Sequence, residues 1–230
     1  MKLFNWLTKQ TEKTNEIIKT QQLTTKETLN DIISETIKPF LKDNGYGKKA
    51  LTFYKKSDDL TFVINFQNSQ GNSSDQTRFY INCGIYSSHI DKTIDKIELK
   101  EPKEYECHYR VRISQITNSK LDGYTIDTNT DSDKLKQSLK EDLKTTLRHF
   151  DSIKSITDLT DLMISYNCLD FTLFEYFILT SDLKNTEKQV KKIEEVWNSE
   201  VRWTRIKNDL NRILTQYNQQ MTIDEILTKK

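Results

Sequence analysis

Glycine and proline are scarce in this chain. Its 230 residues include only 5 glycines and 2 prolines. Glycine-rich loops that cradle phosphates need glycines at fixed spacing, followed by Lys and Ser or Thr, and no segment has that pattern. The shortage also favours long regular helices and strands, because glycine and proline are the residues that most often interrupt them.

The chain also lacks paired cysteines and a membrane-spanning run. Its cysteines, Cys83, Cys107 and Cys168, lie far apart, and their odd number without CxxC spacing is typical of buried thiols in a reducing compartment. No window reaches the roughly 18 apolar residues that a membrane helix needs. We therefore expect a cytoplasmic protein with no membrane span.

Neither sign of charge dominates. Lys and Arg total 35 and Asp and Glu total 34, a net charge of +1, which disfavours nucleic acid as the partner. Basic residues and tryptophans gather between residues 188 and 212, but acidic residues interleave with them, which is typical of a solvated helix face. RNA or DNA binding through this segment is kept as a hypothesis, ranked third after the two given at the end of this section. The scattered His and Cys show no metal-ligand spacing, so we predict neither metal nor cofactor.

The spacing of apolar residues predicts three regions. Residues 1–22 are an amphipathic leader, 23–150 an α+β domain, and 151–230 a helical C-terminal extension packed on it. Helical spacing begins after a capping box formed by Thr24 and Glu27. From residue 50 to 128 the period is two, predicting strands at 50–56, 60–68, 77–86, 104–113 and 123–128. Helical spacing returns after Asp131, with one long helix expected over 187–217.

We thus predict an antiparallel sheet of about four to six strands, flanked by helices at 24–44 and 131–150. Within the strand at 104–113, alternation places Cys107 and Tyr109 on the apolar face. It places His108, Arg110 and Arg112 on the opposite face. If the strands are neighbours, further polar side chains share that second face, namely Gln67, Tyr80 and Asn82.

Guanidinium, amide and aromatic groups on one surface suit the recognition of carboxylates, phosphates or nucleotide bases. Two other interpretations stay open. The polar face could hold only cross-strand hydrogen bonds and Arg–acid pairs, or the C-terminal helices could cover it as a buried polar network, with Glu106 and Asp122 as acidic neighbours. No catalytic pair is evident, since His108 and Cys107 face opposite ways on a strand.

Four segments in order resemble the bacterial family catalogued as domain of unknown function 4304. They are Lys38-Pro39-Phe40-Leu41-Lys42-Asp43-Asn44-Gly45-Tyr46, a first hairpin at residues 51–67, Phe79-Tyr80-Ile81-Asn82-Cys83-Gly84-Ile85, and Glu106-Cys107-His108-Tyr109-Arg110-Val111-Arg112. The last two are similar to the family's F-x-I-N-L-G and C-H-x-R-x-R strands. The family often has a tryptophan where this chain has Asp122-Gly123-Tyr124. The resemblance covers roughly residues 30–150 and implies an α+β domain without an established activity.

Our leading hypothesis is a non-enzymatic cytoplasmic protein that binds a partner protein through the face around His108, Arg110 and Arg112. A toxin-neutralising immunity protein is one version of it, by analogy. The alternative is an anion- or nucleotide-binding protein, with an enzyme as one variant. There Arg110 and Arg112 clamp phosphate, His108 transfers a proton, and Asn82 or Gln67 orients the ligand.

Overall fold

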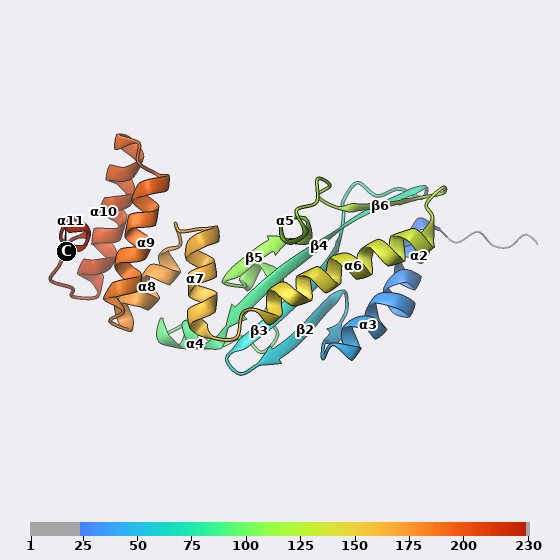
Figure 1. Cartoon of the computed structure of the whole chain (residues 1–230), viewed down its shortest axis with the longest axis horizontal. Helices are drawn as coiled ribbons and strands as arrows, with labels where there is room; N and C mark the ends of the chain where they lie inside the picture. Colours follow the sequence, from blue (N-terminus) through green and yellow to red (C-terminus); the bar gives the residue numbers. More distant parts are fainter. Residues whose placement is uncertain (1–23, 229–230) are drawn as a thin grey trace, which may run out of the picture.

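An antiparallel sheet forms the centre of the N-terminal two thirds of the chain. The computed structural model describes residues 24–228. In that range the sheet has six strands in the order β1-β2-β3-β4-β5, with β6 also paired to β4, and every pair is antiparallel. The strands are β1 (Gly47–Lys49), β2 (Thr52–Ser57), β3 (Leu60–Asn68), β4 (Gln76–Ser87), β5 (Tyr109–Arg112) and β6 (Tyr124–Asp127). With its flanking helices, this sheet confirms the predicted α+β fold (Figure 1).

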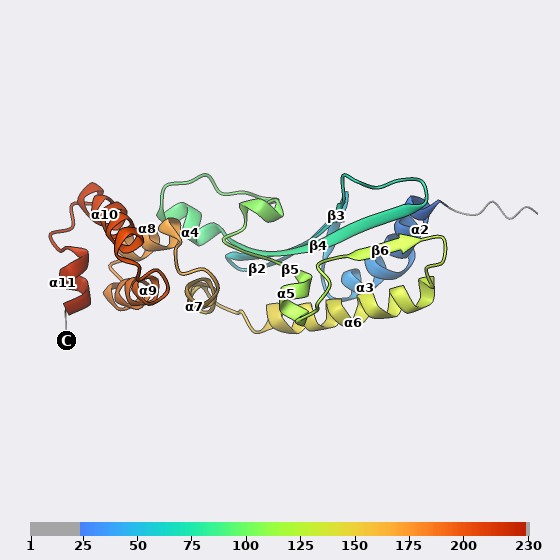
Figure 2. The same ribbon diagram turned by 90° about the horizontal axis from the view of Figure 1, so that it is seen from above.

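One face of the sheet carries the main core. Alternate side chains along β3 and β4, such as Phe62, Ile64, Phe79 and Ile81, are buried there. The helices α2 (Thr25–Asp31), η1 (Ile32–Ile37), α3 (Lys38–Asp43) and α6 (Ser132–Asp151) cover this face (Figure 2). The opposite face, called the outer face below, is covered only in part, by the loop that follows β4.

The sequence signals for the flanking helices are confirmed. Thr24 accepts the Glu27 amide at 3.3 Å, and the Glu27 carboxylate accepts the Thr24 amide at 2.8 Å, which completes the capping box before α2. Asp131 caps α6 in a similar way. The wider turns of η1, a π-helix, end just before Pro39, which has no amide hydrogen to donate to a carbonyl one turn earlier.

The predicted strand at 104–113 is wrong at both ends. Residues Glu104–Glu106 form a short 3₁₀ turn, η2, and Ile113 opens the helix α5 (Ile113–Thr117). Cys107 therefore precedes β5 and does not join Tyr109 on the core face. It lies over Gly84 on the outer face, where an added Cβ on Gly84 would stand 2.6 Å from the Cys107 sulfur. There it packs with Tyr86 and Val63 in a small separate cluster.

The segment between β4 and η2 forms the helix α4 (Ser88–Thr93) and a loop that returns across the outer face (Figure 2). Ser87 caps this helix by accepting the Ile90 amide at 3.2 Å. A single buried serine at the end of a strand is a local signal that the alternating pattern does not reveal.

The C-terminal part is helical: α7 (Ile156–Tyr166), α8 (Phe171–Leu179), α9 (Leu183–Val196), α10 (Glu200–Gln216) and α11 (Ile223–Thr228). The single long helix expected over 187–217 is wrong. The helix is interrupted at residues 197–199, where Ser199 takes an extended conformation as the N-cap of α10. This break lets α10 fold back along α9 (Figure 1).

Two apolar clusters organise these helices. α7 and one side of α8 join the core of the sheet through residues such as Leu159 and Phe177. The other side of α8 and the helices α9–α11 form a second cluster around Val190, Leu210 and Leu214. The predicted leader at 1–22 lies outside the described residues. No helix between residues 24 and 228 has the length and apolar character to cross a membrane.

Candidate binding site on the outer sheet face

A row of polar side chains crosses the outer face at one level of the sheet. The register pairs Asn65 with Asn82 and Asn82 with Arg112, so these three side chains project from neighbouring strands. The Asn82 amide donates to Gln67 Oε1 at 2.8 Å, and the Asn65 amide donates to Thr52 Oγ1 at 2.8 Å. These cross-strand bonds fix the orientation of both asparagines.

Neighbouring residues position the Arg112 side chain, yet part of its guanidinium forms no hydrogen bond with the residues that the structure describes. Its guanidinium carbon lies 4.0 Å from the centre of the Tyr80 ring, and Nε is 3.6 Å from Asp122 Oδ2. Its backbone amide donates to Gln115 Oε1 at 2.9 Å. Yet Arg112 Nη1 is buried and meets no hydrogen-bond partner in the described part of the chain. A positioned guanidinium with spare donors is suited to a planar anionic group.

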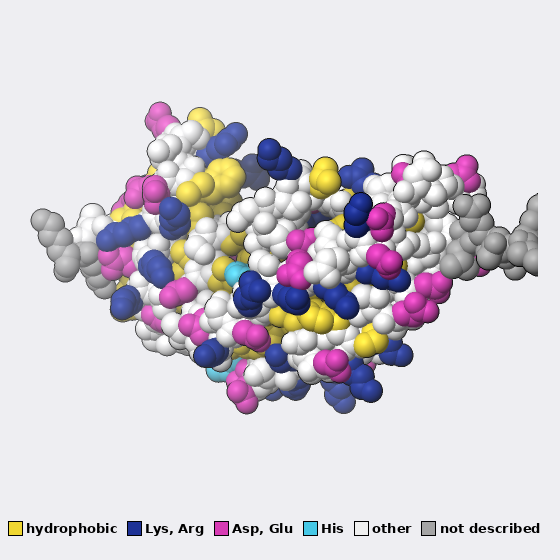
Figure 3. Space-filling model, turned by 45° about the vertical axis from the view of Figure 1, so that its right-hand side comes forward, with side chains coloured by type: hydrophobic (Ala, Val, Ile, Leu, Met, Phe, Trp, Pro, Cys, Tyr) yellow, Lys and Arg dark blue, Asp and Glu magenta, His cyan; other side chains and the backbone are white. Residues whose placement is uncertain are grey.

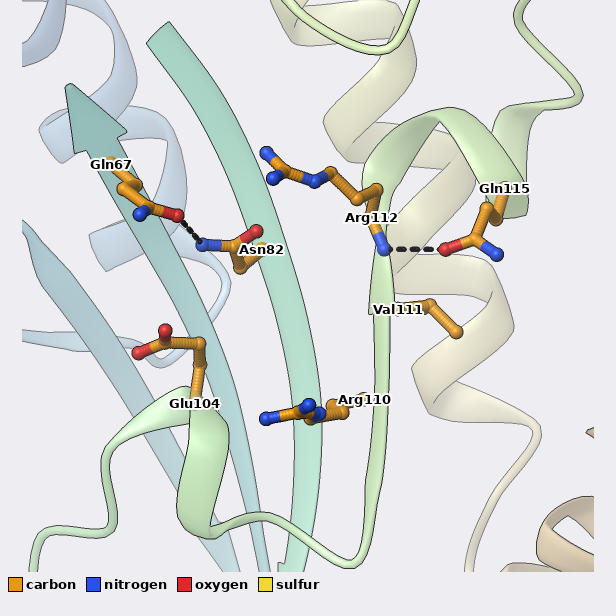
Figure 4. A pocket seen from close by; sticks show the side chains of 7 residues that line it. All are labelled: Gln67, Asn82, Glu104, Arg110, Val111, Arg112 and Gln115. Carbon is orange, nitrogen blue, oxygen red and sulfur yellow. Dashed lines mark hydrogen bonds between the residues drawn. The ribbon is translucent and has the colours of Figure 1, made fainter. Parts of the chain in front are cut away.

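Arg112 lines a cleft of about 280 Å³ with Arg110, which we call the arginine cleft. Figure 4 shows Arg112 extending from β5 toward Asn82, and Arg110 extending across β4 on the side where Glu104 lies. Arg110 is exposed and forms no ion pair within residues 24–228. The remaining wall is made by Glu104, Val111 and Gln115. Of the six side chains predicted from sequence, four line this cleft and Tyr80 supports it from below.

Sequence reasoning missed Glu104 and Gln115. Glu104 lies in η2, where the alternating pattern predicts part of a strand. Gln115 follows Arg112 by three residues, the spacing of a capping box, and that signal could have revealed both the start of α5 and the contact with the Arg112 amide. The contact between Arg112 and Asp122 agrees with the acidic neighbour considered from sequence.

His108 does not line the arginine cleft. Because β5 begins at Tyr109, His108 lies before the paired strand and its side chain is only 7% exposed. Its Nδ1 accepts the Ser87 amide at 3.1 Å, so its proton is on Nε2, which is 3.2 Å from Asp91 Oδ1. Tyr86 donates to the other oxygen of Asp91 at 2.8 Å. His108 therefore joins α4 to the end of β4.

The ionisable groups around His108 stabilise the fold and do not form a reactive centre. Burial raises the pKa of Asp91, but the hydrogen bonds from His108 and Tyr86 outweigh burial and hold that pKa below its ordinary value. Burial raises the pKa of the Cys83 and Cys107 thiols far above the usual range, so neither is an activated nucleophile.

Charges of both signs interleave over the surface that Figure 3 shows, without a large patch of one sign. Within residues 24–228, no three His, Cys, Asp or Glu side chains come close enough together to hold a metal ion. The arginine cleft therefore brings two cationic side chains together on a surface of mixed charge, and Arg110 forms no ion pair within residues 24–228. Its chemistry is the binding and orientation of an acceptor group such as a carboxylate or phosphate.

Comparison with known proteins identifies the domain that carries this cleft. Residues 37–160 match the family model described as "Domain of unknown function (DUF4304)", and the match spans more than half of the chain. It includes all of β1–β6 and the residues of the cleft. No curated protein and no solved structure matches the chain. The chain belongs to the DUF4304 family.

Proposed function

We propose that this chain is a non-enzymatic binding protein of the bacterial cytoplasm and that its arginine cleft receives an acidic side chain of a partner protein. The observation that carries the proposal is the state of Arg112. Its guanidinium is held by Tyr80 and Asp122 while Nη1 stays buried without a partner in the described chain. A carboxylate in the cleft would pair with the exposed part of this guanidinium, whose side chain is 33% exposed, and with Arg110 beside it.

The fixed position of Arg112 supports recognition because less side-chain freedom is lost when a ligand binds. Three further facts agree with this function. The cysteines are free, as expected in a reducing compartment. Asn82 and Gln67 offer amide groups beside the arginines, and the cleft lies on an open sheet face. A toxin-neutralising immunity protein is one form that such a binder could take.

The test compares two charge-reversed forms of the whole chain in quantitative affinity capture from the source cell. One form carries Arg110→Glu and Arg112→Glu. The matched control carries Arg148→Glu and Arg205→Glu, which changes the net charge equally at exposed positions on α6 and α10. We expect one protein to be captured by the native chain and the control but lost from the cleft variant. Equal capture by a folded cleft variant would refute the proposal.

A small anion or nucleotide is the second candidate, favoured by the cleft volume of about 280 Å³ beside an Arg112 side chain with a donor that is unsatisfied within residues 24–228. A true ligand raises the melting temperature with the logarithm of its concentration. A thermal-shift screen of phosphate, nucleotides and dicarboxylates should then show a rise that Arg112→Gln abolishes. A flat response throughout the screen would remove this candidate.

A further inference from the structure

β5 is an edge strand, and its free edge can be read from one hydrogen bond. β4 pairs with β5 on one side, and β5 ends the strand order (Figure 1). The Arg112 amide donates to the Gln115 side chain, so it points away from β4. In an antiparallel pair, amide and carbonyl directions alternate along the strand. The backbone N–H and C=O of Arg110 therefore also point away from β4, toward the free edge.

A second cavity lies along this free edge. It has a volume of about 320 Å³, and four consecutive residues, Cys107 to Arg110, form one wall. Two of these residues, Tyr109 and Arg110, belong to β5, so the cavity borders the start of this strand. The opposite wall comes from the end of α7 and the residues that follow it, with Met163, Tyr166, Asn167 and Asp170, the N-cap of α8. Arg110 lines both this edge groove and the arginine cleft.

The groove offers different chemistry on its two sides. Arg110 and Arg112 project on the outer face, where neither carries a full complement of acceptors. Tyr109 projects on the other face, where its ring packs edge-on against Tyr166 at 5.2 Å, and Tyr166 remains 46% exposed. An unpaired strand edge between positive and apolar side chains is a template for another strand.

We propose that an extended segment of the partner protein adds to the sheet along the free edge of β5. This inference rests on the proposed function and specifies its mode of binding. The added strand would exchange backbone hydrogen bonds with Arg110. Its acidic residues would lie beside Arg110 and Arg112, and its alternate residues, which are apolar, would lie toward Tyr109 and Tyr166. The arginine cleft thus selects the acid and the edge groove binds the backbone.

The probe is a capped peptide of alternating glutamate and valine, about eight residues long, which matches a typical strand. Binding to the full chain is measured by fluorescence anisotropy, and amide hydrogen exchange is followed residue by residue by NMR. In the free protein the Arg110 amide should exchange fast while the Val111 amide, which points toward β4, is protected. Bound peptide should slow exchange at Arg110 by at least about tenfold.

A pair of variants separates the contribution of the Arg110 backbone amide to peptide binding from that of its side chain. Arg110→Ala removes the guanidinium alone, whereas Arg110→Pro also removes the outward amide and leaves the hydrogen bonds to β4 intact. We expect both variants to fold and the proline variant to bind the peptide about tenfold more weakly than the alanine variant. A peptide N-methylated on its strand-facing amides should lose binding to the native chain.

The outcomes distinguish the two proposals. Binding that needs the arginines, protects the Arg110 amide and falls further with proline supports strand addition. Strand addition is overturned if binding needs the arginines but the Arg110 amide still exchanges fast, and if the Arg110→Ala and Arg110→Pro variants bind the peptide equally well. In that case the proposed function of the arginine cleft still stands. Absence of binding, or binding unchanged in the Arg110→Glu, Arg112→Glu variant, overturns strand addition as well; the capture experiment then decides the proposed function by itself.

Discussion

Replacing His108 with alanine should destabilise the fold without weakening partner binding. The change removes the acceptor of the Ser87 amide and the donor to Asp91, both in a region that is almost completely buried. An unsatisfied buried amide costs about 1–3 kcal/mol, and the bond lost by the carboxylate adds about 1 kcal/mol, since Tyr86 still donates to it. The total is about 3 kcal/mol.

The assay is thermal and urea unfolding of the native chain and the variant. A loss of about 3 kcal/mol should lower the melting temperature by roughly 6–12 °C for a chain of this size. His108→Asn is the matched control, because its side-chain oxygen can take the place of Nδ1 and accept the Ser87 amide. We expect asparagine to recover part of the loss.

The same network predicts a pH dependence. The pKa of Asp91 is lower in the folded chain than in the unfolded chain, so its stabilising contribution is fully present above about pH 4. That contribution is lost as the pH falls through the folded-state pKa. The stability difference between the native chain and Asp91→Asn should therefore shrink below about pH 4.

The reasoning about His108 would be refuted if His108→Ala abolished partner binding and left the stability of the fold unchanged. That result would place His108 in the binding surface.

Four further outcomes are expected. Gly84→Ala should cost about 1–3 kcal/mol in chemical denaturation, because the new Cβ meets a cysteine side chain at 2.6 Å, whereas Gly71→Ala, with nothing within 4 Å, should be close to neutral. Tyr80→Leu should weaken partner affinity in calorimetry by about two- to fivefold through loss of the cation–π contact, with little change in stability. Leu210→Ala should cost about 2–5 kcal/mol and speed amide exchange first in α9–α11, because it opens the second cluster. Cys83 should resist alkylation at pH 8 until the chain is unfolded, since burial raises the pKa of its thiol.

Period-two spacing predicted the central strands well because those strands are long and bury one face. The strand at Leu60–Asn68 matches its predicted bounds, and β4 extends the prediction by one residue at each end. The helix signals at Thr24 and Asp131 succeeded because a capping side chain acts within one turn. These interactions are local, and local interactions are what single-sequence patterns record.

The edges of the candidate site could not be predicted because tertiary contacts decide them. The alternation through Cys107 and His108 suggests a strand, yet both residues precede the ladder and serve other contacts. Cys107 fills the space left by Gly84, and His108 joins β4 to α4. Neither partner lies near in sequence, so no spacing rule identifies them. The same reason hid Glu104 from the predicted site.

The central claim is that the arginine cleft binds an acidic side chain of a partner protein. Its most direct measurement is the dissociation constant of the captured partner, by calorimetry, for the native chain, the Arg110→Glu, Arg112→Glu variant and the Arg148→Glu, Arg205→Glu control. Loss of two charge-assisted contacts predicts a dissociation constant at least about 100-fold higher for the cleft variant. The control should stay near the native value. Equal constants for all three folded proteins would contradict the claim.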